Sequence, residues 1–250
     1  MTYCLGMKVK SGLVAIADTR LTSGVECSIG KKIFVHQRDR HSLFIMTSGL
    51  RSVRDKVITY FQECLELNDN RYNKLYKAVN GLAEQLRKVA QEDKAYLTAS
   101  GLYFNLYAIV GGQLEDDHEH KLYLLYPEGN WIEIGADGSP FFIIGNSGYG
   151  KPILNRTITP DTSLNFALKT GLLSFDSTRV SANDVDFPID VAIYQKDSFN
   201  LVEQRFERED VSEVTQFWQQ SLSSAINKIP EKWMDSVLKK LSPDEVESLF

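Results

Sequence analysis

The chain has 250 residues, 43% of them hydrophobic, and carries 33 acidic against 28 basic side chains for a net charge of -5. A chain of this length buries about 70% or more of its unfolded surface, so we expect a stable globule. Both signs of charge are interspersed without a basic stripe, which argues against a nucleic-acid partner. The longest apolar stretches, such as residues 102–112, fall short of the about 20 residues that span a bilayer, which argues against a membrane protein.

The N-terminal sequence predicts a cytoplasmic protein. It reads MTYCLGMKVK and lacks the basic segment, the continuous apolar segment and the small-residue cleavage site of a secretory signal. The three cysteines, Cys4, Cys27 and Cys64, are odd in number and have the spacings of neither a disulfide framework nor a zinc site. We therefore expect free thiols.

Period-two alternation predicts four short strands in the first fifty residues. They cover residues 3–9, 13–18, 32–36 and 42–47. Two amphipathic helices follow, because apolar side chains then recur at steps of three and four. The helices cover residues 53–67 and 75–89.

The second half of the chain repeats this order. Strands are predicted at residues 103–110, 121–126, 131–135 and 141–144. Helices are predicted at residues 149–155 and 161–175, the second capped at Thr159 and Pro160. Two strands, 189–194 and 200–206, precede a helical tail from Asp210 in which Pro230 and Pro243 punctuate two more short helices.

The order of these elements predicts the fold class. Runs of strands alternate with pairs of helices, which is typical of an α+β protein in which two sheets pack together under outer helices. We therefore expect a four-layer α/β/β/α sandwich. Since no linker or repeat interrupts the chain, we expect a single domain over residues 1–250, with a C-terminal helical extension over about 210–250.

Common catalytic motifs are absent from the sequence. There is no GxSxG, HExxH, Walker or GxGxxG pattern in the right context, and the four histidines do not indicate a catalytic triad. The acidic run EDDHEH at residues 115–120 is more typical of a solvated turn than of a metal site. We therefore predict neither a metal nor a cofactor.

Thr2 is a candidate nucleophile once Met1 is removed. Its hydroxyl can attack a carbonyl, and its α-amine, with a pKa of about 7.7 to 8.0, can accept the proton. Many proteins begin Met-Thr, so the hypothesis needs Asp18 and Lys32, since a lysine near the hydroxyl would lower its pKa and a carboxylate would anchor that lysine. Alternatively, Asp18 and Lys32 form a surface ion pair worth about 0 to 1 kcal/mol.

Several segments resemble the proteasome β-subunit family over nearly the whole chain. They are TYCLGMKVKSGLVAIADTRLTSG, GKKIF and HSLFIMTSGLRSVRDK, and they are similar in particular to the bacterial ancestral β-subunits, the Anbu type. The resemblance implies the sandwich fold of N-terminal-nucleophile hydrolases and a threonine peptidase. It also implies roles for Thr2 as nucleophile, Lys32 as the lysine beside it, and Asp18 as the carboxylate paired with that lysine.

The resemblance implies three further site residues. Gly49 would donate its backbone N–H to the oxyanion, Ser147 in GNSGYGKP would lie near the Thr2 amine, and Asp176 would be the second carboxylate behind it. The serine that follows Asp176 in the family has two possible matches, Ser177 and Ser181.

Three functions are consistent with this pattern. The first is a threonine peptidase acting on peptides or proteins, and the second is an amidohydrolase of the same type acting on small amides. The third is a non-catalytic β-type scaffold or binding subunit, which retention of Met1 would favour. The resemblance also implies self-assembly into a ring or spiral homo-oligomer, while the identity of any unfoldase partner and the cleavage specificity stay open.

Overall fold

The computed structural model describes residues 2–23, 26–67, 71–136, 138–238 and 240. The chain divides into two compact units, one up to Asp210 and one from Val211. In the second unit the helices are α5 (Ser212–Ile226), the 3-10 turn η3 (Lys232–Met234) and α6 (Asp235–Leu238). The helix predicted near Pro243 lies outside the described residues, and the view of this segment as an extension of one domain stays a prediction.

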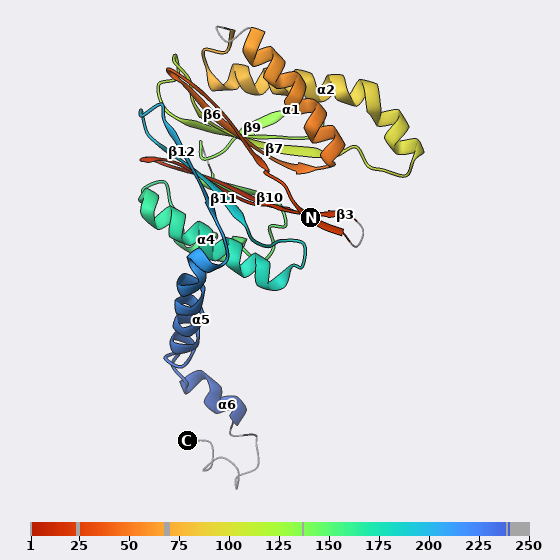
Figure 1. The fold of residues 1–250 in the computed structure, drawn as a ribbon. Helices are drawn as coiled ribbons and strands as arrows, with labels where there is room; N and C mark the ends of the chain where they lie inside the picture. The colour runs from red at the N-terminus through yellow and green to blue at the C-terminus, as the bar shows by residue number, and fades with distance from the viewer. Residues whose placement is uncertain (1, 24–25, 68–70, 137, 239, 241–250) are drawn as a thin grey trace. The chain divides into compact units, whose positions relative to one another are not determined.

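The first unit contains two five-stranded antiparallel sheets and a separate hairpin (Figure 1). The first sheet has the order β10-β1-β2-β11-β12. Its strands are β1 (Tyr3–Val9), β2 (Gly12–Asp18), β10 (Phe141–Gly145), β11 (Ile189–Gln195) and β12 (Leu201–Phe206). In its register Cys4 of β1 lies between Ala17 of β2 and Ile144 of β10.

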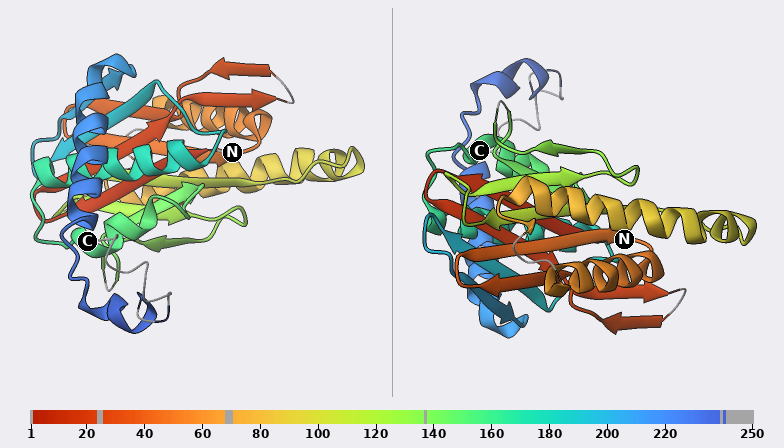
Figure 2. Two further views of the ribbon diagram at one scale, coloured as in Figure 1. Left: turned by 90° about the horizontal axis from the view of Figure 1, so that it is seen from below. Right: turned by 90° about the horizontal axis from the view of Figure 1, so that it is seen from above.

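The second sheet follows the order β5-β6-β7-β8-β9. Its strands are β5 (Ile33–Arg38), β6 (His41–Gly49), β7 (Leu106–Gln113), β8 (Lys121–Leu125) and β9 (Trp131–Glu133). The hairpin consists of β3 (Arg20–Ser23) and β4 (Glu26–Ile29). It projects from the end of the unit at which the chain begins, as both views of Figure 2 show.

Helices cover the outer face of each sheet. Helices α1 (Arg51–Leu67) and α2 (Leu75–Ala99) form one hydrophobic core with the second sheet. Helices α3 (Lys151–Thr157) and α4 (Leu164–Ser181) form another with the first sheet, and a third core fills the space between the two sheets. The predicted α/β/β/α sandwich is thus confirmed, and Figures 1 and 2 show its layers.

Strand β1 illustrates how the alternation of side chains builds two cores at once. Tyr3, Leu5 and Met7 point toward α3 and α4, whereas Cys4 points into the core between the sheets. All four side chains are completely buried. The strand that follows Thr2 is therefore packed between two hydrophobic cores.

The structure differs from the predicted elements in several places. Strand β7 begins three residues later than predicted, at Leu106, and α4 ends at Ser181 instead of residue 175. The β3–β4 hairpin was not predicted, and α2 continues to Ala99. The predicted start of α4 at residue 161 was wrong, because the carbonyl of Pro160 accepts the N–H of Lys10 at 2.8 Å and holds this segment as a turn. The helix begins at Leu164, where the Ser163 side chain accepts the N–H of Phe166.

The acidic loop at residues 115–120 supports the start of α2. The Oδ2 atom of Asp117 accepts the N–H groups of Leu75 at 2.9 Å and Leu114 at 3.0 Å. Within the described ranges, no group of three or more histidine, cysteine, aspartate or glutamate side chains could hold a metal ion.

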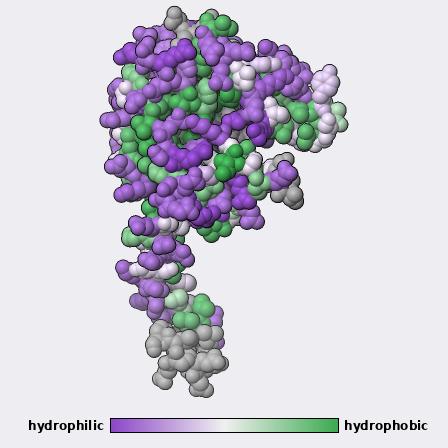
Figure 3. Space-filling model, viewed as in Figure 1, coloured by the Kyte–Doolittle hydropathy of each residue, from purple (hydrophilic) through white to green (hydrophobic). Residues whose placement is uncertain are grey.

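The surface of the first unit visible in Figure 3 is mostly hydrophilic, with hydrophobic residues in scattered small patches. No helix among the described residues is long and apolar enough to cross a membrane.

Candidate active site at Thr2

Thr2 is held in place through its backbone at the start of β1. Its carbonyl accepts the N–H of Asn146 at 2.7 Å, directly beyond the end of β10. Gly145 makes this approach possible: its φ is +89°, and a Cβ atom there would lie 1.9 Å from the Thr2 carbonyl oxygen. The backbone of Thr2 is thus held against the end of β10, where Gly145 has no side chain that would block the contact. The Thr2 side chain itself is half-buried.

Asp18 connects the residue after Thr2 to Lys32. Its Oδ1 atom accepts both the N–H of Tyr3 at 2.8 Å and the Nζ of Lys32 at 2.7 Å. Its Oδ2 atom accepts the N–H of Arg20 at 3.2 Å. Asp18 ends β2 and Lys32 precedes β5, so the carboxylate joins the two sheets at the end of the molecule where Thr2 lies.

The Asp18–Lys32 contact is a buried ion pair. The exposed fractions of the two side chains are 0% for Asp18 and 5% for Lys32, which excludes the alternative of a surface pair. Burial raises the pKa of Asp18, whereas Lys32 and the two backbone N–H donors oppose this effect by stabilising the carboxylate. A buried charge with three donors is a costly arrangement that proteins retain for positioning or chemistry.

A small pocket opens beside Thr2. It is lined by Thr2, Leu21, Lys32, Thr47, Gly49, Arg51 and Arg54. The fold therefore brings three of the predicted site residues, from the chain start and from the ends of two other segments, to one cavity.

Gly49 has a conformation that only glycine tolerates well. Its φ is +147°, and a Cβ atom would lie 2.0 Å from the carbonyl oxygen of Asn105. Gly49 ends β6, and α1 begins at Arg51. The backbone at the edge of the pocket is thus fixed by close packing against the start of β7.

Ser147 and Asp176 lie in the first unit but do not line this pocket. Ser147 is half-buried, and it follows Asn146, whose N–H binds the Thr2 carbonyl. Asp176 is buried on α4, and its Oδ1 atom accepts the Nη2 of Arg179 at 2.7 Å. Their predicted roles beside the Thr2 amine stay predictions.

The two candidate serines after Asp176 have different surroundings. The Ser177 hydroxyl donates to the carbonyl of Leu173 in its own helix at 2.8 Å. Ser181 is exposed at the last position of α4.

Ser174, which no sequence pattern singled out, supports the strand that follows Thr2. The Tyr3 hydroxyl donates to the Ser174 Oγ at 2.7 Å, and both side chains are completely buried. This bond ties β1 to α4. A buried tyrosine hydroxyl needs a polar partner, but sequence patterns alone do not identify which one.

Cys4 is the other nucleophilic side chain close to Lys32. It is completely buried, and its thiol donates weakly to the carbonyl of Thr47 at 3.8 Å. Burial raises the pKa of Cys4, so its sulfur is a protonated thiol rather than a reactive thiolate. The cysteine is therefore part of the core between the sheets.

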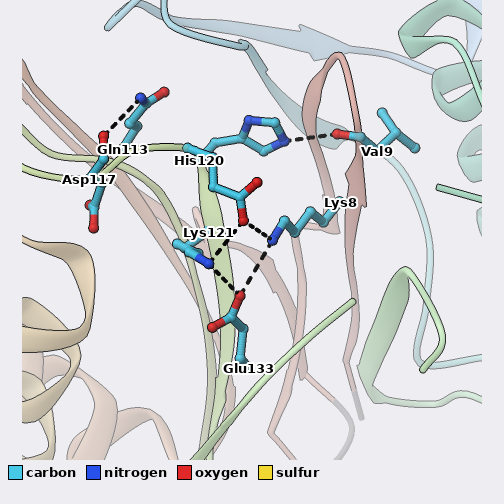
Figure 4. A network of polar contacts seen from close by, with 8 residues as sticks. Lys8, Val9, Gln113, Asp117, His120, Lys121 and Glu133 are labelled. Atoms are coloured by element: carbon cyan, nitrogen blue, oxygen red, sulfur yellow. Dashed lines mark hydrogen bonds and ion pairs between the residues drawn. The ribbon is translucent and has the colours of Figure 1, made fainter. Parts of the chain in front are cut away.

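A second group of charged residues lies near the other end of β1 (Figure 4). Lys121 contacts Glu119 and Glu133, each at 2.9 Å. Lys8 contacts the same two carboxylates at 3.2 and 3.4 Å. The two positive and two negative charges compensate one another. Lys8 lies six residues after Thr2, which is about 20 Å along the strand at about 3.4 Å per residue. This closed network is a structural connection between the sheets.

Comparison with known proteins places the chain among proteasome-type subunits. The proteasome subunit family model matches residues 2–193. An Anbu (Gly-1) mutant from Hyphomicrobium sp. strain MC1 is 33% identical, with a TM-score of 0.85 over 92% of this chain and 99% of the other. Anbu (ancestral beta-subunit) from Yersinia bercovieri is 31% identical, with a TM-score of 0.84 over 91% of this chain and 97% of the other.

A third similar structure is the helical assembly of the Anbu complex from Pseudomonas aeruginosa. It is 31% identical, with a TM-score of 0.83 over 91% of this chain and 97% of the other. Curated protein sequences contain no match to the chain.

Proposed function

This chain belongs to the proteasome subunit family, and we propose that it is a threonine peptidase of the N-terminal-nucleophile type, acting in the cytoplasm. In this proposal the mature chain begins at Thr2, and its helices from about residue 210 extend the same β-subunit-like domain. The substrate is a peptide or protein.

The observation that carries the proposal is the shared Oδ1 atom of Asp18. This atom accepts the N–H of Tyr3, next to Thr2, and the Nζ of Lys32. One buried carboxylate thereby fixes the backbone of the nucleophile and the cation beside it. An ion pair retained for stability alone would not need to lie at the chain start, and a hydrophobic pair of similar volume is often as stable.

The proposed reaction uses both the hydroxyl and the α-amine of Thr2. The free α-amine accepts the hydroxyl proton as Oγ attacks the peptide carbonyl, and the positive charge of Lys32 lowers the pKa of the hydroxyl and favours the neutral amine. The Gly49 N–H stabilises the oxyanion of the tetrahedral intermediate. The α-amine of Thr2 then passes this proton to the leaving nitrogen and the amine product departs. Water hydrolyses the acyl-enzyme ester and restores Thr2.

Ser147 and Asp176 have supporting roles in this proposal. Ser147 follows the residue that binds the Thr2 carbonyl, which supports a position near the amine. Asp176 is a buried carboxylate on the helix that supports β1 through Ser174. A carboxylate near the amine would stabilise its protonated form in the tetrahedral intermediate, before the proton passes to the leaving nitrogen.

We also propose that the protein assembles with copies of itself. The similar Anbu complex from Pseudomonas aeruginosa is a helical assembly, which supports an open spiral more than a closed ring.

Intact-protein mass spectrometry tests the proposed function. The protein is produced in a bacterial cytoplasm and treated with a β-lactone that reacts with N-terminal threonine. Loss of one methionine and one adduct on Thr2 are expected. Retention of Met1 with no adduct would contradict the peptidase and favour the non-catalytic scaffold, because Thr2 would then lack a free amine.

A further inference from the structure

The pocket beside Thr2 has an excess of positive charge. Of its lining residues, Lys32 is balanced by Asp18, whereas Arg51 and Arg54 share the single carboxylate of Asp55. The Arg54 Nη1 lies 2.8 Å from Asp55 Oδ1, and the Arg51 Nε lies 3.4 Å from Asp55 Oδ2. Among the residues that the structure describes, three cations thus face two carboxylates, which leaves one positive charge unmatched.

The position of these arginines on α1 is unfavourable for the helix itself. Arg51 is the first residue of α1, Arg54 lies one turn later on the same face, and the first turn contains no acidic residue. Because the N-terminal end of a helix is the positive end of its dipole, cations there are destabilising. Side chains at positions that are unfavourable for the local structure are often found at functional sites.

The guanidinium groups of Arg51 and Arg54 differ in how freely they can bind a ligand. The Arg54 guanidinium is fixed, since its Nη1 donates to Asp55 and its Nη2 donates to the carbonyl of Lys31. Its side chain is 24% exposed. The Arg51 side chain is 66% exposed and has one long contact with Asp55, so it can turn toward a ligand.

We infer that this pocket selects an aspartate or glutamate side chain at the substrate residue whose carbonyl Thr2 attacks. The inference rests on the proposed function. In that reaction the attacked carbon lies between Thr2 Oγ and the Gly49 N–H, so the side chain on the adjoining Cα is the one nearest to the pocket that both residues line. A guanidinium fork matches a carboxylate in charge and geometry.

Other side chains fit this pocket less well. A lysine or arginine side chain would meet a pocket lined by three cations and would lose its hydration. An aliphatic side chain could contact Leu21, but it would desolvate Arg51 without pairing it. The positive end of α1 adds to the preference for an anion.

The test uses three peptide epoxyketones that are identical except for glutamate, leucine or lysine at the residue that enters the pocket. The rate of Thr2 modification is measured by intact mass. For the natural protein we expect the glutamate probe to react about tenfold faster than the leucine probe, the range of a charge-assisted hydrogen bond, and the lysine probe to react slowest. The preference should weaken at high salt because Arg51 is exposed.

Two variants move the preference in opposite directions. Arg51→Glu should remove the preference for the glutamate probe or reverse it in favour of lysine. Asp55→Asn keeps an oxygen for Arg54 but removes the competing charge, so the preference should increase. Arg71→Glu, an equal change of charge on an exposed residue outside the pocket, should leave it unchanged.

The outcomes separate the two proposals. If no probe modifies Thr2, the proposed function fails and the pocket assignment fails with it. If the probes modify Thr2 at equal rates, or a preference persists unchanged in Arg51→Glu, only the pocket assignment is overturned. Misfolding of Arg51→Glu is detected by its unfolding midpoint. We expect this midpoint to change little, since an acidic residue suits the start of a helix and offsets the lost contact with Asp55.

Discussion

The Nζ atom of Lys32 lies 2.7 Å from Oδ1 of Asp18, and both side chains are shielded from solvent. The same oxygen binds the N–H of Tyr3, so the position of the residue after Thr2 depends on this ion pair. The candidate nucleophile is therefore coupled to a contact that also connects β2 to the start of β5.

Removing the Asp18 carboxylate should be strongly destabilising. Asp18→Asn leaves the Lys32 charge buried without a counterion, so we expect the free energy of unfolding in urea to fall by about 3–5 kcal/mol. The double variant Asp18→Asn/Lys32→Met should recover part of this loss, because no uncompensated charge remains.

Lys31→Met is the matched control for this prediction. Lys31 is 51% exposed and pairs with Glu203 on the surface, so its loss should change stability by less than about 1 kcal/mol. Equal losses of stability in Lys31→Met and Asp18→Asn would contradict the prediction, because the buried pair would then contribute no more to stability than a surface pair.

Replacing Thr2 should abolish turnover without affecting the fold. Thr2→Ala lacks the hydroxyl, and its backbone can still bind Asn146 and leave Asp18 in place. We expect complete loss of β-lactone labelling with an unchanged unfolding midpoint. Thr2→Ser is the control, since it keeps the oxygen and should retain labelling. Labelling of Thr2→Ala would assign the nucleophile to another residue.

Gly145→Ala should disturb the start of β1 selectively. A methyl group there would lie 1.9 Å from the Thr2 carbonyl oxygen, and the φ of +89° is strained for alanine. We expect a loss of about 1–3 kcal/mol of stability together with slower labelling of Thr2.

Gly138→Ala is the control for this prediction, because a Cβ atom at Gly138 meets no other atom within 4 Å. It should leave both stability and labelling nearly unchanged. Normal labelling of Gly145→Ala would mean that Thr2 does not need the close contact with β10.

His120 should make stability pH-dependent in weakly acidic solution. Figure 4 shows its Nε2 in contact with the carbonyl of Val9. The distance between the two atoms is 2.8 Å, and the residue is 2% exposed. Burial lowers the pKa of His120 below its ordinary value. Below about pH 6.5 the unfolded chain therefore binds more protons than the native protein, so stability is lost as the pH falls through the pKa of the folded state.

Urea unfolding of the natural protein and of His120→Gln between about pH 5 and 7.5 tests this effect. The glutamine side chain can still donate to the carbonyl of Val9 but does not titrate. We expect a smaller loss of stability toward pH 5 in the variant. Identical pH profiles would assign the acid sensitivity to other groups.

Local patterns determined most of the secondary structure. The strand predicted at residues 3–9 has the observed bounds of β1, and the one at 13–18 differs from β2 by one residue. The hairpin of β3 and β4 was missed, since β4 is four residues long and exposed throughout and so lacks an alternating pattern. Helix α2 was predicted ten residues too short, because its last turns are mostly exposed and have a weak apolar stripe.

The sequence by itself determined the layered fold class, the family resemblance and the candidates Thr2, Asp18 and Lys32, because these depend on patterns and spacings along the chain. Only the tertiary structure decided that the Asp18–Lys32 pair is buried and that Arg51 and Arg54 share a pocket with Thr2. The physical reason is that burial and pocket charge depend on which distant segments the two sheets bring together. Those contacts arise from the packing of β1, β6 and α1, which no local pattern specifies.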